Sequence, residues 1–252
     1  MSSVEPATES SSTGGRFLWL FHGGFALLCG ITLLLAGNQP GPAILALTVL
    51  YNTALPAACL LAGDRDSISD FSPRGIMRRL VWSGGQVPER EDALIDAMFR
   101  VHIGDRELPG DYEASPNWPY VRPGKWGATN AMSPQYATGL VERILQAEPK
   151  VPTLWIYGAE DLAVSNTAAS DPGTWGPTGR LPGFPGSEAF PPQPMMDQIR
   201  RMLEAYRERG GTVEEVAIDD AGHVPFITHP EPFNRAFHAH LERIVTTETE
   251  HA

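Results

Sequence analysis

The sequence predicts an α/β fold in its C-terminal half, from two apolar strands and the helices that alternate with them. The strands are Val151 to Tyr157 and Val213 to Ile218, and each runs into a polar turn. Between them, residues 194–209 (PMMDQIRRMLEAYRER) place their apolar side chains on one helical stripe, with a proline at the start and two glycines after the end. Strand, helix, strand and helix in this order imply parallel strands packed under helices.

Further helices are expected on both sides of this unit. Residues 91–101 (EDALIDAMFRV) and 134–147 (PQYATGLVERILQA) carry apolar residues at helical spacing. A closing helix is expected from Pro232 to Ile244, with its phenylalanines and leucine on one face. Residues 105–135, rich in Gly, Pro, Trp and Tyr, are expected to be irregular.

The N-terminal quarter has a different composition. Residues 1–15 are rich in Ser, Thr, Gly and Glu, which predicts disorder. From Phe17 to Gly63 there is no Asp, Glu, Lys or Arg, and a polar joint divides this run into residues 17–36 and 41–62. Each piece has about the length of a membrane-spanning helix. We therefore expect a transmembrane hairpin within residues 16–63, inserted through residues 17–62, with the C-terminal region in the cytoplasm.

Two other interpretations of this run stay open, and both describe a soluble cytoplasmic protein. The apolar pieces can be core helices of a soluble domain, or strands of one. The strand interpretation has one specific attraction. Leu18 to Gly24 (LWLFHGG) is similar to the strand and HGG turn that supply oxyanion donors in many lipases and esterases.

Charge and composition exclude some classes of function. The formal net charge of −11 argues against nucleic-acid binding, which needs clustered Lys and Arg. With 42% apolar and 19% charged residues, the chain has the composition of a globular protein with a core. Cys29 and Cys59 lack the spacing of a metal site, so no metal is expected.

The turns after the two predicted strands carry a possible acid–base pair. Asp161 follows the first strand in the turn GAED, and His223 follows the second in the turn AGH. An acid and a histidine on adjacent strand ends are two members of a nucleophile–His–acid relay. Asp219 and Asp220 are alternative candidates for the acid. Taken alone, Asp161 is often explained as a turn former or helix cap and His223 as a structural histidine, whereas the two together, in this order, favour the relay.

Over roughly residues 65–245 the chain resembles the α/β-hydrolase superfamily. The resemblance lies in the order and spacing of a strand, a turn with an acid, a helix, a second strand and a turn with a histidine. The resemblance implies a partial hydrolase-like parallel sheet within residues 64–252, with a cap over about 65–148 and a C-terminal core over 149–245. It implies that Asp161 orients His223, which acts as general base on ester-type bonds of a small apolar substrate. It implies no cofactor.

The nucleophile that this resemblance requires has no obvious place in the sequence. No G-x-S-x-G elbow, or its Cys or Asp equivalent, precedes the predicted cap. Ser83, in Val81-Trp-Ser-Gly-Gly85, is followed by two glycines but lacks the preceding one. Two functional hypotheses therefore stay open: an ester hydrolase, and a non-catalytic, membrane-tethered binding module that keeps the pocket without the nucleophile.

Overall fold

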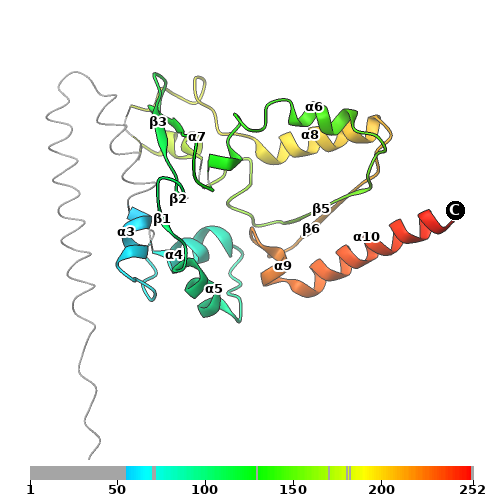
Figure 1. Ribbon diagram of the computed structural model, residues 1–252, viewed down its shortest axis with the longest axis horizontal. Coiled ribbons are helices and arrows are strands. Elements are labelled where there is room, and N and C mark those ends of the chain that lie inside the picture. Colours follow the sequence, from blue (N-terminus) through cyan, green and yellow to red (C-terminus); the bar gives the residue numbers. More distant parts are fainter. Residues whose placement is uncertain are drawn as a thin grey trace, which may run out of the picture.

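The structure, a computed structural model, describes residues 55–250 except 70, 71, 129, 170, 180 and 182. Helices and small two-stranded sheets make up this part of the chain (Figure 1). In chain order the elements are α3 (Leu55–Leu61), α4 (Pro73–Ile76), the π-helical turn η2 (Met77–Val81), α5 (Glu91–Met98), β1 (Ile103–Gly104), β2 (Leu108–Pro109), β3 (Tyr112–Ala114), β4 (Val121–Pro123), the 3₁₀ turn η3 (Asn130–Met132), α6 (Leu140–Gln146), β5 (Thr153–Gly158), α7 (Pro172–Trp175), the 3₁₀ turn η4 (Gly176–Thr178), α8 (Met195–Glu208), β6 (Val213–Ile218), α9 (Pro225–Thr228) and α10 (Pro230–Glu250).

The parallel pair β5–β6 is the longest strand pairing among the described residues. The two strands run in register from Thr153 opposite Val213 to Gly158 opposite Ile218. Parallel neighbours need a crossover connection, and α8 lies in it. In Figure 1, α8 runs along one side of the strand pair and α10 along the other. The polar turns that follow β5 and β6 therefore lie at the same end of the pair.

Polar contacts attach both helices to the strands. On the α8 side, Glu215 of β6 accepts hydrogen bonds from Arg200 of α8 at 3.1 Å and from the Tyr157 hydroxyl of β5 at 2.9 Å. On the α10 side, Glu214 lies 2.9 Å from the ring of the buried His240 and also pairs with Arg243. Because adjacent residues of a strand point to opposite faces, these two glutamates bind one helix each.

The structure confirms an α/β class and several of the predicted elements. Strand Val213–Ile218 has its predicted bounds, and β5 starts two residues later than expected. Helix α6 is shorter than predicted, because residues 134–139 form turns that end at Gly139 in a left-handed conformation. The segment 105–135, expected to be irregular, contains the antiparallel pair β3–β4. Assignment to the α/β-hydrolase superfamily stays a prediction.

The transmembrane prediction is corrected by the described part of the chain. None of the helices there combines the length and the apolar character needed to cross a bilayer. The helical part of the second predicted span that the structure describes is α3. Its seven residues make a helix about 10 Å long, which is a third of the thickness of the hydrocarbon core of a bilayer. Residues 17–54, which hold the remainder of the predicted hairpin, lie outside the described residues.

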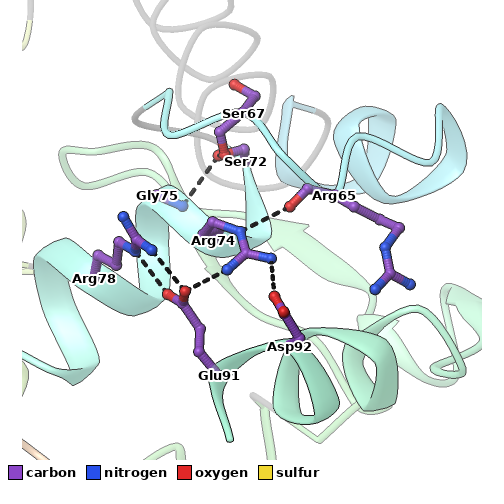
Figure 2. Close-up of polar contacts among 8 residues, drawn as sticks. All are labelled: Arg65, Ser67, Ser72, Arg74, Gly75, Arg78, Glu91 and Asp92. Carbon is purple, nitrogen blue, oxygen red and sulfur yellow. Dashed lines mark hydrogen bonds and ion pairs between the residues drawn. The ribbon is translucent and has the colours of Figure 1, made fainter. Parts of the chain in front are cut away.

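A network of charged side chains joins α4 and η2 to α5 (Figure 2). The guanidinium of Arg74 contacts the carboxylate of Glu91 and, at 2.7 Å, that of Asp92. Arg78 donates two hydrogen bonds to Glu91, both at 2.6 Å. Arg74 also donates from Nε to the carbonyl of Arg65 at 3.0 Å. Glu91 is therefore the centre of the network, with Arg78 on both of its carboxylate oxygens and Arg74 on one of them.

Burial makes the ionised state of Glu91 important for stability. The side chains of Arg74 and Glu91 retain only 10% and 9% of their exposure. The hydrogen bonds from Arg78, together with the charges of both arginines, outweigh burial and lower the pKa of Glu91 below its ordinary value. Because folding lowers the pKa of Glu91, its ionised carboxylate stabilises the fold at any pH above the pKa that it has in the unfolded chain. That contribution is lost as pH falls through the folded-state pKa.

Glu91→Gln is expected to destabilise the protein by about 3 kcal/mol at neutral pH, because it removes the buried charge that pairs with both Arg74 and Arg78. Urea unfolding measures this loss, and the difference from wild type should shrink as pH falls and Glu91 becomes protonated in the wild type.

Asp92→Asn is the matched control, since Asp92 binds the same arginine with a side chain that is 81% exposed. This substitution is expected to lower the free energy of unfolding far less. Equal losses in the two variants would contradict the role given to burial.

Candidate acid–base site

Three chain segments meet at the end of the β5–β6 pair and build one site. They are residues 81–85 from the end of η2, residues 158–161 from the end of β5, and the turn 220–223 after β6. Backbone hydrogen bonds connect the two strand-end turns: Ala159 N–H donates to Ile218 O, and Glu160 N–H to Ala221 O, both at 2.9 Å. His223 N–H donates to Val81 O at 2.9 Å, which ties the second turn to the first segment.

The approach of these segments depends on glycine. A Cβ atom on Gly158 would lie 2.1 Å from Gly222 O, and one on Gly222 would lie 2.5 Å from Ser83 O. Gly84 has φ +93° and passes just as close to Asp220 O, at 2.2 Å from an added Cβ. Since real Cβ atoms do not come this close to backbone oxygens, a side chain at any of these positions would push the segments apart.

The site's two functional side chains are Asp161 and His223, and they are hydrogen-bonded to each other. Asp161 Oδ2 lies 2.9 Å from His223 Nδ1. The other carboxylate oxygen, Oδ1, accepts the backbone N–H groups of Ala163 at 2.7 Å and Val164 at 2.9 Å. These bonds fix the carboxylate as an acceptor toward the ring. With Nδ1 engaged by a carboxylate, Nε2 is the nitrogen left for proton exchange.

Exposure differs sharply between the two partners. The Asp161 side chain retains 10% of its exposure, whereas the His223 side chain retains 39%. Among the described residues no hydrogen-bond partner is found for His223 Nε2. The pair therefore has a buried, oriented acid behind a base whose outer nitrogen is free to meet a bound molecule.

The pair shifts the pKa of both members in opposite directions. Burial favours the neutral form of Asp161, but the hydrogen bonds from His223, Val164 and Ala163 outweigh it and lower the pKa of the carboxyl. The hydrogen bond to Asp161 raises the pKa of His223 above its ordinary value, against the effect of burial. Asp161 is therefore held ionised, and it stabilises the imidazolium that His223 forms when it accepts a proton.

The other sequence candidates are not brought into this pair. Asp219 and Asp220 make no hydrogen bond to His223, and Asp220 instead occupies the turn with φ 56°. Ser83 lies against the turn of His223, but its hydroxyl donates to Glu160 O at 2.7 Å. The HGG turn at residues 22–24 lies outside the described residues.

The support that the segment 81–85 gives to the site was not predicted from the sequence. Ser83 holds the turn after β5 through Glu160, which lies about eighty residues later in the chain. The Val81 carbonyl holds the turn after β6 through His223, about 140 residues later. The glycine pair after Ser83 was the available signal, because consecutive glycines mark a close backbone approach as well as a turn.

No protein-family model matches this chain, and neither a curated protein nor a solved structure matches it. The function of the site is therefore inferred from its own geometry.

Asp161→Asn is expected to lower the pKa of His223, because the substitution removes the carboxylate that raises it. An NMR titration of the His223 ring measures this directly in both proteins. Because folding raises this pKa, the protonated ring stabilises the fold below its unfolded-state pKa, and this contribution is lost as pH rises through the folded-state value. An unchanged pKa in the variant would show that the two side chains are not paired in solution.

Proposed function

We propose that the chain is a hydrolase-type protein in which His223, oriented by Asp161, is the general base toward ester-type bonds of small apolar molecules. One observation carries the proposal. His223 Nδ1 is hydrogen-bonded to Oδ2 of the buried Asp161 carboxylate, and Oδ1 of that carboxylate accepts two backbone N–H groups. His223 Nε2 is therefore free to exchange a proton. This arrangement is the acid–base half of a nucleophile–His–acid relay.

Each residue of the pair has a distinct role in the proposed reaction. His223 Nε2 takes the proton of an attacking oxygen as that oxygen bonds to the ester carbonyl carbon. The resulting imidazolium is stabilised by ionised Asp161, and then gives the proton to the leaving oxygen as its bond to carbon breaks. Asp161 is a positioning residue that stays ionised throughout.

The surroundings of His223 favour an apolar substrate. Phe226, three residues further along, is exposed, and its ring packs edge-on against that of Phe233 with centroids 5.8 Å apart. An exposed aromatic residue three positions along the chain from a proton-exchanging histidine offers an apolar surface to the non-reacting part of a substrate. A charged substrate gains less from this contact, and an anionic one is further disfavoured by the net charge of −11.

A second candidate function is binding without turnover. It is favoured by the position of Ser83, because this serine lies against the histidine turn but uses its hydroxyl to bond a backbone carbonyl. If no other oxygen nucleophile reaches His223 Nε2, the site binds a small apolar molecule and leaves it intact.

Hydrolysis of a short-chain nitrophenyl ester is expected from the wild-type protein and is expected to fall by at least about 100-fold in His223→Ala, the usual contribution of a general base. The rate should increase with pH through the pKa of His223, because only the neutral ring accepts a proton. Labelling with a fluorescent organophosphonate, followed by peptide mapping, identifies a side-chain nucleophile if there is one.

His238→Ala is the matched control, because His238 is an exposed histidine on α10 beside the Phe237 ring and away from Asp161. Its hydrolysis rate should equal that of wild type. Ester binding by folded wild-type protein with no turnover and no organophosphonate label would contradict the hydrolase proposal and support the binding function.

A further inference from the structure

Ser83 contacts both of the strand-end turns that carry the acid and the base. Its hydroxyl donates a hydrogen bond to Glu160 O at 2.7 Å, and Glu160 directly precedes Asp161. Its backbone packs against Gly222, which directly precedes His223. A Cβ atom added to Gly222 would lie 2.5 Å from Ser83 O and 2.7 Å from both Ser83 N and Ser83 Oγ. One residue therefore lies against the neighbour of each member of the pair.

The segment that carries Ser83 is anchored in the buried interior. The preceding residue, Trp82, retains 1% of its exposure and donates its backbone N–H to Met77 O of η2 at 2.7 Å. The residue before that, Val81, accepts the N–H of His223 at 2.9 Å. Ser83 itself is 7% exposed. A buried residue next to a fully packed tryptophan has little freedom to shift, so Ser83 is a fixed point for the two turns.

The hydroxyl of Ser83 completes the hydrogen bonding of the Glu160 backbone. The N–H of Glu160 donates to Ala221 O at 2.9 Å, and its carbonyl accepts from Ser83. Without the hydroxyl, this carbonyl loses its donor in a partly buried position. An acceptor left unpaired there costs free energy, which the turn recovers by moving toward water. Because Glu160 is joined to Asp161, such a movement displaces the acid.

Two other roles of Ser83 fit these contacts less well. A nucleophile shares its hydroxyl proton with the histidine of the relay, whereas the hydroxyl of Ser83 is donated to Glu160 O. A residue with a structural role alone stabilises the fold and leaves the separation of acid and base unaffected. The contacts of Ser83 fall on the residues directly before Asp161 and His223, where a displacement is passed on to the pair.

We propose that Ser83 is a positioning residue that sets the separation between Asp161 and His223. Its hydroxyl fixes the turn of the acid and its backbone fixes the turn of the base. The contact of 2.9 Å between Asp161 Oδ2 and His223 Nδ1 therefore depends on both. The proposal rests on the pair and not on turnover, so its outcome is separate from that of the hydrolase function.

The pKa of His223 reports on this separation, because the hydrogen bond to Asp161 is the main cause that raises it, with the charge of Asp161 adding to it and burial opposing both. Two variants of the full-length chain weaken the donor at position 83 in steps. Ser83→Cys keeps a thiol, which is a weak donor, and Ser83→Ala keeps none. An NMR titration of the His223 ring should give a pKa that falls from wild type to Ser83→Cys and further to Ser83→Ala. Ester hydrolysis should fall in the same order, by up to about 100-fold, the cost of a misplacement of about 1 Å.

Ser133→Ala is the matched control. Ser133 is also 7% exposed, and its hydroxyl has no hydrogen-bond partner in the part of the chain that the structure describes. Its N–H donates to Asn130 O in the turn after η3. The substitution removes a buried hydroxyl that is bonded to neither strand-end turn, so the pKa of His223 should equal that of wild type.

Three results would overturn the proposal. A pKa of His223 in folded Ser83→Ala equal to that of wild type would limit Ser83 to a structural role. An equal fall of this pKa in Ser133→Ala would assign the effect to the loss of any buried hydroxyl. Labelling of Ser83 by the organophosphonate would make it the nucleophile. If Ser83→Ala does not fold, Ser83→Cys decides in its place, since the pKa of His223 in that variant must lie below that of wild type.

Discussion

The contact between the turn after β5 and the turn after β6 is the constraint on which the site depends. Gly158 and Gly222 allow the two backbones to come closer than any side chain would permit, and hydrogen bonds from Ala159 and Glu160 hold them there. The parallel register of the strands delivers both turns to one end of the pair. Asp161 and His223 then meet because each lies a fixed, short distance beyond its strand.

The remainder of the described structure supports this contact largely through charged and polar groups. Glu214 and Glu215 attach one helix to each face of the strand pair, and the hydroxyl of Tyr206 in α8 bonds both the N–H and the carbonyl of Val151. On the other side of the site, the network around Glu91 fixes α4 and η2, from which the segment 81–85 continues to the histidine turn. Buried charges of this kind are stabilising only while they remain paired.

Much of the site was predictable from the sequence because its signals are local. An apolar strand followed by a turn with an acid or a histidine is contained in about ten residues, and the parallel order of the strands places the two turns together. The hydrogen bond from Ser83 to Glu160 was not predictable, since the two residues are 77 positions apart and no local pattern specifies that pairing. The same limit applies to β3–β4, whose three-residue strands are too short to produce a periodic pattern.

The transmembrane prediction failed for a related reason. Length and lack of charge suit a membrane span, but they equally suit chain that is buried inside a protein. In the described residues the apolar run ends in the seven-residue helix α3, followed by Gly63 with φ +68° and a polar loop. Hydropathy measures how strongly a segment avoids water and does not identify what covers it.

The central claim is that an ionised Asp161 fixes the orientation and the tautomer of His223. Nitrogen-15 NMR of the neutral His223 ring, recorded above its pKa, tests it most directly. The account predicts that the proton resides on Nδ1, donated to Asp161, with Nε2 unprotonated and able to act as a base. A neutral ring protonated mainly on Nε2 would contradict the account, because that nitrogen would then have no lone pair with which to accept a proton.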